Sequence, residues 1–280
     1  MGSYRPLAAL AALLLVPLSG GRARAAEPSP PYISPKAGTA RVEARRPAKP
    51  AGPTPMVRRG LILPSGLLDP YLSPFAERPV GGDELRAGTS FGAVWGFLPE
   101  MHLDVQIGPN YLTPRAPPGM GRFTVTGRFV QSRPVDLGAS FMVVLDPNPG
   151  HALLSYVQPG LPAILRPNEH LRIDTGIHVP MYPTGDRRIG LRVPLNVYVQ
   201  PADRYHLGAT SALFVPDTRD PKGTTLPVGL TGGYTAGPEL SFLAITPYVT
   251  WTNFYQPATG ALDTRSFVAG VIADFIIDLR

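Results

Sequence analysis

The sequence predicts an all-β fold: an antiparallel, up-and-down transmembrane β-barrel of about 12 strands. Three observations lead to this prediction. Apolar and polar residues alternate from about residue 60 onward, turns containing proline recur at nearly regular intervals, and the composition disfavours helices. The 280 residues include 30 glycines and 35 prolines, and both residue types penalise helix interiors.

The alternation is clearest over residues 188–200. One face of this segment is apolar: Ile189, Leu191, Val193, Leu195, Val197 and Val199. The other face carries Arg188, Gly190, Arg192, Pro194, Asn196, Tyr198 and Gln200. Residues 101–108 and 170–181 have the same pattern. Because successive side chains of a strand point to opposite faces, this period of two predicts strands with one apolar and one polar face.

Turns containing proline recur at Pro99, Pro134, Pro167, Pro201 and Pro238, which lie 35, 33, 34 and 37 residues apart. A unit of this length fits two strands of about 9–11 residues, one short turn and one longer loop. Helical solenoids have repeats of similar length, but they lack alternating strands joined in turn by short and longer connections. The repeat therefore predicts a series of hairpins with short turns at one end of the barrel and longer loops at the other.

Twelve strands are expected, with both ends of the barrel region on the short-turn side. Their ranges are 60–68, 85–97, 100–112, 121–131, 134–145, 152–166, 169–181, 187–200, 203–215, 225–236, 239–255 and 265–279. The first is the weakest, since Pro64 and Gly66 interrupt it. Ten or eleven strands with an irregular entry segment are the alternative.

Period two alone does not distinguish a membrane barrel from a soluble sandwich, because a soluble sheet also has one apolar and one polar face. The expected strands are longer than the five or six residues typical of soluble sheets. Lysine is nearly absent from residues 60–280, where only Lys222 occurs, whereas soluble sheets often place lysines on exposed edges. Together with the alternation of short turns and longer loops, these features favour a barrel whose apolar face contacts lipid.

This layout over residues 60–280 resembles bacterial outer-membrane β-barrel proteins, particularly porin-like and transporter-like ones of Gram-negative bacteria. The resemblance implies a location in the outer membrane, contact with its lipids and transport of small solutes or ions. Proteins of this class commonly end on an aromatic residue that the assembly machinery recognises. Here the alternating face Phe267 to Leu279 is followed by Arg280, which departs from that pattern.

Residues 1–25 are typical of a signal peptide. Arg5 supplies a positive charge, residues 7–18 form an apolar stretch, and Ala23-Arg24-Ala25 has the small-x-small pattern of a cleavage site. The apolar stretch is shorter than the 20 or so residues that a spanning helix needs. An uncleaved anchor is the alternative.

Residues 26–59 predict a proline-rich, basic, disordered linker. They contain seven Lys and Arg against two Glu, whereas residues 60–280 contain 16 basic and 18 acidic residues. The formal charge of +6 therefore comes from the N-terminal segments and not from a folded face, and no nucleic-acid partner is expected. The segment has too little apolar surface for its burial to offset the conformational entropy that is lost on ordering. The linker is either an inert spacer or a tether that contacts the anionic cell wall.

The polar face of the strands carries charged residues that are expected to line the lumen. These candidates are Arg86, Asp104, Arg122, Arg128, Asp136, Arg172, Asp174, His178, Arg188, Arg192 and Asp274. A ring of arginines in a lumen attracts anions. The same charges can instead pair across strands and fill a barrel of about twelve strands, which lies between small filled barrels and open porins.

The sequence gives no indication of catalysis, of a cofactor or of a metal site. There is no cysteine, so thiolate chemistry and zinc sites with cysteine ligands are excluded. The His-x-Ser motif of outer-membrane phospholipases is absent, as are nucleotide-binding glycine motifs. His102 with Asp104, and Asp174 with His178, share strand faces, but two ligands are weak evidence for a metal.

We therefore expect a non-enzymatic barrel that lets small solutes or ions pass through a charged lumen. A structural or adhesive barrel without a conducting pore is the alternative, and a lipid-modifying enzyme is the least favoured reading.

Overall fold

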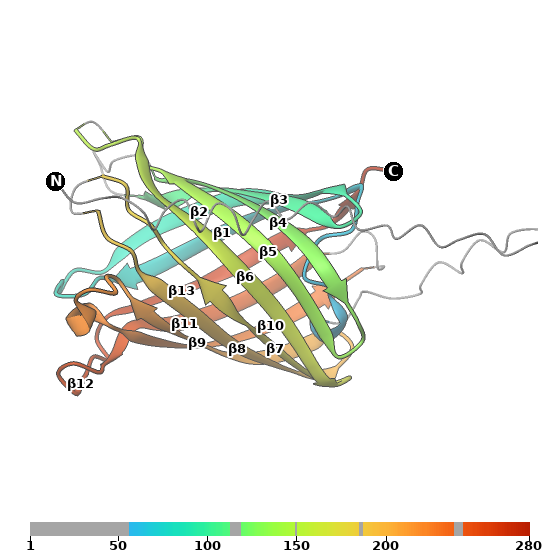
Figure 1. The fold of residues 1–280 in the computed structure, drawn as a ribbon. Coiled ribbons are helices and arrows are strands. Elements are labelled where there is room, and N and C mark those ends of the chain that lie inside the picture. The colour runs from blue at the N-terminus through green and yellow to red at the C-terminus, as the bar shows by residue number, and fades with distance from the viewer. Residues whose placement is uncertain (1–55, 113–118, 149, 185–186, 238–242) are drawn as a thin grey trace, which may run out of the picture. The chain divides into compact units, whose positions relative to one another are not determined.

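The computed structural model describes residues 56–112, 119–148, 150–184, 187–237 and 243–280. Twelve long strands form one antiparallel sheet that closes on itself (Figure 1), as the sequence predicts. Two strand pieces of two residues each, β12 and β14, and two 3-10 turns, η1 and η2, complete the described elements. Within these residues, no helix is long and apolar enough to cross a membrane.

The twelve long strands follow one another around the barrel. They are β1 (Leu67–Arg78), β2 (Arg86–Leu98), β3 (Met101–Tyr111), β4 (Gly121–Gln131), β5 (Val135–Leu145), β6 (Leu154–Asn168), β7 (Leu171–His178), β8 (Leu191–Ala202), β9 (Tyr205–Val215), β10 (Leu226–Ala236), β11 (Leu243–Gln256) and β13 (Phe267–Phe275). The short elements are η1 (Met56–Arg58), η2 (Pro221–Gly223), β12 (Ala261–Leu262) and β14 (Ile277–Asp278).

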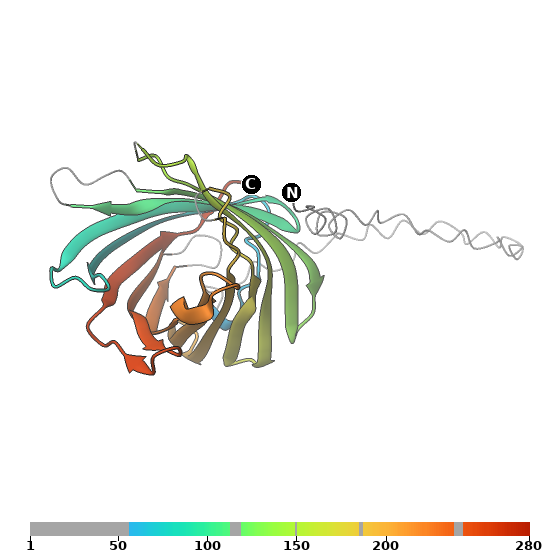
Figure 2. The ribbon, with the colours of Figure 1, turned by 60° about the vertical axis from the view of Figure 1, so that its left-hand side comes forward.

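The barrel closes where the first strand pairs with the last. β1 and β13 are antiparallel, with Tyr71 opposite Asp274 and Arg78 opposite Phe267. All the remaining pairs of long strands join strands that are consecutive in the sequence, so the topology is up-and-down (Figure 2). Among the described strands, closure leaves no unpaired sheet edge, which is the condition for placing strands in lipid.

The two ends of the barrel differ in the length of their connections. At one end, two or three residues join β2 to β3, β4 to β5, β6 to β7 and β8 to β9. At the other end, the connections run from seven residues, between β1 and β2, to twelve, between β7 and β8. The chain enters and leaves the barrel at the short-turn end, as expected from the hairpin repeat.

Apolar side chains cover the outside of the barrel. Leu72, Phe91, Phe141, Leu161 and Leu207 lie in five different strands and are 44–62% exposed. Residues of the opposite parity on these strands face the lumen and are buried although polar: they include Ser73, Ser90, Gln158 and His206, at 4–9%. This arrangement is the reverse of a soluble protein, and it is the one that lipid requires.

The strand expected over residues 60–68 is not present, and the first strand runs instead over Leu67–Arg78. Two prolines, Pro70 and Pro74, obscure it in the sequence because proline cannot donate to a sheet ladder. The ladder between β1 and β13 pairs Tyr71 and Leu72 and resumes at Phe75, so Pro74 falls at an interruption. Residues 60–66 form an irregular entry segment, as in the alternative, but the strand count is the expected twelve and not ten or eleven.

The expected signal peptide and residues 26–55 of the expected linker lie outside the described residues. Residues 56–59, at the end of that linker range, belong to the folded barrel, where Val57 is fully buried.

A charged lumen and the strap inside it as the candidate functional site

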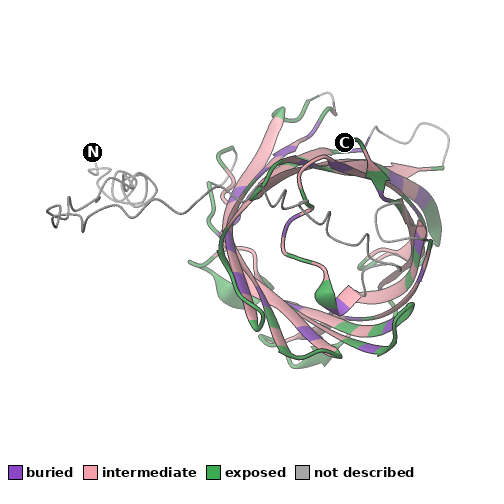
Figure 3. Cartoon of the chain, turned by 90° about the vertical axis from the view of Figure 1, so that its right-hand side faces the viewer, coloured by how far each residue is buried: buried purple, intermediate pink, exposed green. Residues whose placement is uncertain are grey.

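Residues 56–66 precede β1 and lie inside the ring of strands at the short-turn end (Figure 3). We call this segment the strap. It begins with the 3-10 turn η1 and ends at Gly66, whose φ of 80° lies in the left-handed region that favours glycine. Val57 and Ile62 are 0% and 5% exposed, so the strap is packed into the barrel.

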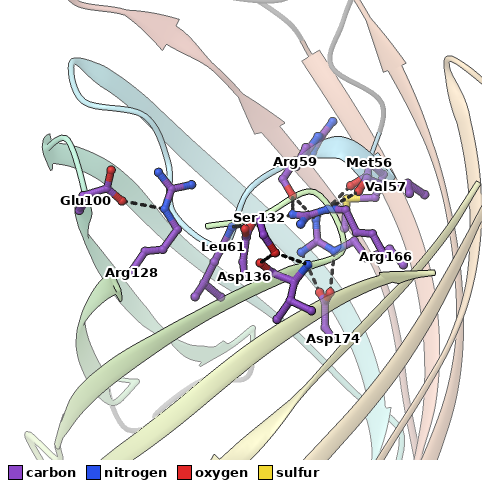
Figure 4. A network of polar contacts seen from close by, with 12 residues as sticks. Met56, Val57, Arg59, Leu61, Glu100, Arg128, Ser132, Asp136, Arg166 and Asp174 are labelled. Atoms are coloured by element: carbon purple, nitrogen blue, oxygen red, sulfur yellow. Dashed lines mark hydrogen bonds and ion pairs between the residues drawn. The ribbon is translucent and has the colours of Figure 1, made fainter. Parts of the chain in front are cut away.

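Two arginines of the barrel wall hold the strap by its backbone (Figure 4). The Arg166 side chain, from β6, donates to the carbonyl oxygens of Val57 at 2.9 Å and Arg59 at 2.7 Å. Arg172, from β7, donates to those of Met56 and Arg59, both at 3.0 Å. The irregular backbone of the strap leaves these carbonyls without sheet partners, and the guanidinium groups supply donors in their place.

Each arginine is also paired with a carboxylate of the wall. Arg166 donates to Asp136 at 2.9 Å, and both side chains are enclosed, at 12% and 3% exposure. Arg172 makes a two-pronged contact with Asp174, at 2.6 and 2.8 Å. Such bidentate pairs fix the guanidinium plane. The wall charges are therefore oriented to receive the strap.

Asp136 and two further wall residues accept hydrogen bonds from backbone N–H groups of the strap. Asp136 accepts from Leu61 at 3.3 Å, and Gln200, in β8, accepts from Val57 at 3.3 Å. His102, in β3, accepts from Leu63 at 3.0 Å through Nδ1. That contact requires the ring proton on Nε2 in the neutral form of the ring.

The far end of the strap rests on Gly96 of β2. The N–H of Gly66 donates to the carbonyl oxygen of Gly96 at 2.8 Å. A Cβ atom at position 96 would meet the carbonyl oxygens of Pro64 and Leu63. The absence of a side chain on Gly96 therefore permits the close approach of the strap to the wall.

The side chain of Arg59 extends away from the walls that hold its backbone. Its Nη2 donates to Thr235 of β10 at 3.0 Å. Its charge also interacts with those of Asp274, in β13, and Asp69, in β1. Arg166 and Arg172, which hold the Arg59 backbone, come from β6 and β7. Arg59 thus links two separate sectors of the wall across the short-turn mouth.

A second charged group lies in the long-loop half of the lumen. Arg122 projects from β4 and Arg192 from β8. The charge of Arg122 acts unfavourably on that of Arg192 and favourably on that of Asp104 in β3. Tyr156 lies near Arg192, and His178 is its register partner on β7. Arg192 points inward and is exposed, so water reaches the lumen at this level.

The structure gives partners to most of the other lumen candidates. Asp104 accepts from the hydroxyl of Tyr71 at 3.1 Å. Arg86 faces Glu77 across β1 and β2 near the long-loop rim. Arg188 lies in the β7–β8 connection, where its guanidinium stacks over the ring of Tyr182 at 4.6 Å.

Arg128 pairs with Glu100 at the short-turn end. Its Nε donates to the Glu100 carboxylate at 2.7 Å, and the hydrogen bond lowers the pKa of that carboxyl below its ordinary value. Glu100 lies in the turn between β2 and β3 and is largely exposed. Glu100 therefore belongs to the rim, whereas the enclosed guanidinium of Arg128 also reaches the strap beside Gly60 and lines the same cavity as Asp136.

Four residues important to this network were not among the sequence candidates: Arg59, Asp69, Tyr71 and Arg166. Arg59 was assigned to the linker, and Asp69 and Tyr71 fell after the first expected strand. Arg166 has the same parity as Tyr156 and Gln158 on β6, so the alternation itself indicates that it faces inward.

A cavity of about 1240 Å³ lies between the strap and the short turns. Arg58, Gly60, Ile62 and Pro64 line it from the strap, and residues 131–134 and 166–169 line it from the wall. The strap therefore occupies only part of the short-turn mouth. Among the described residues, no group of three or more His, Asp and Glu side chains is arranged to hold a metal ion.

Comparisons with known proteins bear on the fold. No protein-family model matches the sequence. No curated protein matches it either. Among solved structures, the NanC porin is 8% identical with a TM-score of 0.51, over 76% of this chain and 99% of the porin. The fold is that of an outer-membrane β-barrel.

Two further solved structures have lower TM-scores. An anion-selective porin from Comamonas acidovorans is 7% identical with a TM-score of 0.34, over 75% of this chain and 98% of that one. A FadL homologue from Pseudomonas aeruginosa is 12% identical with a TM-score of 0.32, over 76% and 90%. The predicted fold class is confirmed by the barrel and by the NanC likeness, and the apolar outer surface is the one that the outer membrane requires.

Proposed function

We propose that this barrel lets small hydrophilic solutes pass through its lumen, with a preference for anions. The observation that carries the proposal is the pair formed by Arg122 and Arg192. The two arginines approach each other from distant strands, and their repulsion is an unfavourable arrangement that a passing anion relieves. Arg122 has Asp104 as an acidic neighbour, whereas among the described residues no carboxylate pairs with Arg192 in the way that Asp136 and Asp174 pair with Arg166 and Arg172.

The rest of the lumen supports the proposal. Water reaches Arg192 from the lumen, and the cavity beside the strap leaves room at the short-turn mouth. The outer surface contacts outer-membrane lipids in this proposal, so the lumen is the aqueous route. No reaction is part of the proposed function.

Conductance of the full-length protein in planar bilayers tests the proposal. Under a potassium chloride gradient, we expect channel events with a reversal potential that favours chloride. Arg122→Gln and Arg192→Gln should each shift the reversal potential toward potassium, because each removes a positive charge from the long-loop half of the lumen. Arg265→Gln, in the loop before β13, is the matched control and should leave it unchanged.

A barrel without a conducting pore, with a structural or adhesive role, is the second candidate. The strap favours it, since a segment fixed in the mouth by so many hydrogen bonds narrows the opening. Complete absence of channel events from a preparation whose barrel is folded would contradict the passage of solutes and support this candidate.

A further inference from the structure

The strap carries two positive charges, those of Arg58 and Arg59. The Arg59 guanidinium reaches Thr235 of β10, and the register Thr235–Ala244–Asp274 places Asp274 of β13 at the same level two strands away. Its charge interacts with those of Asp274 and Asp69. These two aspartates also interact with each other, since they lie on the adjacent strands β1 and β13. Each has one oxygen atom that is buried and makes no hydrogen bond. Asp69 and Asp274 therefore form an acidic pair in the wall, and the cation that balances their charge comes from outside the wall.

The position of Arg59 is fixed from both sides. Its carbonyl oxygen accepts from Arg166 and Arg172, and its side chain donates to Thr235. Thr235 is itself 3% exposed. A side chain held at its backbone and at its tip keeps its charge in one place, which is what a selectivity element requires.

We propose that Arg59 is a selectivity-determining residue of the short-turn mouth. This residue comes from the strap and not from the strands of the barrel wall. With Arg59 in place, the charge of Asp69 and Asp274 is offset, and anions approach the mouth without a repulsive barrier. Without Arg59, the same mouth presents two carboxylates, which attract cations and repel anions. This inference rests on the proposed passage of anions through the lumen.

Arg58, the preceding residue, serves as the matched control. It lies on the same strap, but its side chain is 61% exposed and pairs with the exposed Glu169 at 3.4 Å. Replacing it by glutamine removes the same charge one residue away, without exposing the acidic pair.

The experiment compares reversal potentials in a potassium chloride gradient for the full chain and three variants. Arg59→Gln should shift the selectivity from chloride toward potassium, and Arg58→Gln should shift it far less. Asp274→Asn should have the opposite effect and increase the preference for chloride, because Arg59 is then in excess. The Asp274→Asn variant keeps the test valid if Arg59→Gln does not fold.

Adding Asp69→Asn and Asp274→Asn to Arg59→Gln should restore the chloride preference, since the acidic pair is then neutral. Unchanged selectivity in both Arg59→Gln and Asp274→Asn, with channels still open, would overturn the role of Arg59 and leave the proposed function intact. A folded wild-type protein that gives no channels at all would overturn the proposed function itself, and the role of Arg59 with it.

Discussion

Asp136 connects the barrel wall to the strap through one carboxylate. It accepts from the Arg166 side chain at 2.9 Å and from the N–H of Leu61 at 3.3 Å, and it is only 2% exposed. Asp136→Asn keeps the size of the side chain but leaves the enclosed charge of Arg166 uncompensated. Because removal of one partner from an enclosed ion pair is strongly destabilising, we expect a loss of about 3 kcal/mol in the free energy of unfolding.

Urea unfolding in detergent micelles, followed by tryptophan fluorescence, measures this loss. Asp217→Asn is the control, since Asp217 pairs with the exposed Arg219 in the β9–β10 loop. Surface pairs contribute little, so its unfolding curve should match that of the wild type. Equal curves for both variants would show that the Asp136 contact has no role in stability.

Asp146 provides a prediction about pH at the long-loop end. Its carboxylate makes a 2.7 Å contact with Nδ1 of His151, and this hydrogen bond, followed by that from the N–H of Asn148, lowers the pKa of Asp146. The pKa in the folded state lies below the unfolded value of about 3.9. The contact therefore stabilises the loop at a pH above that value, and the stabilisation is lost as the pH falls through the lower, folded pKa.

Carbon NMR of the carboxyl group measures this titration directly. We expect His151→Ala to raise the midpoint of Asp146 toward the ordinary value and to leave that of Asp217 unchanged. Asp217 is a suitable reference because Arg219, and not a histidine, lowers its pKa. An unshifted midpoint for Asp146 in this variant would mean that His151 is not the main cause.

At the scale of elements, eleven of the strands were predictable and one was not. The range 121–131 matches β4 residue for residue, because its alternation has clear ends. β1 was missed because Pro70 and Pro74 resemble loop residues in the sequence. The tertiary pairing on both sides compensates for the donors that these prolines lack, and such pairing is not visible in a local pattern.

The strap could not be predicted from the sequence for a related reason. Its partners lie far along the chain: Gln200 is 143 residues from Val57, and Arg166 is 107 residues from Arg59. The local composition around residues 56–59 is that of a basic linker, and nothing nearby indicates burial. By contrast, Asp136, Arg172 and Asp174 were predicted to face inward, because strand parity requires only local information.

Gly96 offers a test of how the strap is seated. A Cβ atom there meets the carbonyl oxygens of Pro64 and Leu63, so Gly96→Ala should displace the strap from β2. Trypsin cleaves after exposed arginines, and Arg59 is protected within the lumen. We expect cleavage after Arg59 to be faster in Gly96→Ala than in the wild type, as measured by mass spectrometry of the released fragment.

Gly232→Ala is the control for the general effect of adding a side chain to a strand. Its Cβ atom would lie 3.3 Å from a methyl group of Leu207, a flexible side chain that can move. Cleavage after Arg59 should not change in this variant. If Gly96→Ala is cleaved no faster than Gly232→Ala, the strap does not depend on Gly96 for its position.

At the scale of the whole molecule, the barrel and the strap use different interactions. The strands close through their own ladders, including the one between β1 and β13, and none of these ladders includes a strap residue. Apart from Gly66, which makes backbone hydrogen bonds with Gly96 and Leu279, the strap is attached by side chains of the wall: Arg166, Arg172, Asp136 and His102 among them. We therefore expect the barrel to be the independent folding unit and the strap to be an addition that shapes its mouth.

Deletion of residues 56–64 tests this division. The lumen is accessible to water, so water can replace the strap as a hydrogen-bond partner of the wall arginines. The variant without these residues should therefore still form a barrel. Stable barrels migrate differently in electrophoresis before and after boiling, and this difference should persist. Its conductance should rise, because the short-turn mouth is wider, and its selectivity should shift toward cations, because Arg59 no longer offsets Asp69 and Asp274. Replacing the same residues by glycine and serine preserves the length of the segment and should give the same selectivity as the deletion. Loss of the heat-dependent migration in both variants would show that the strap is part of the folding unit.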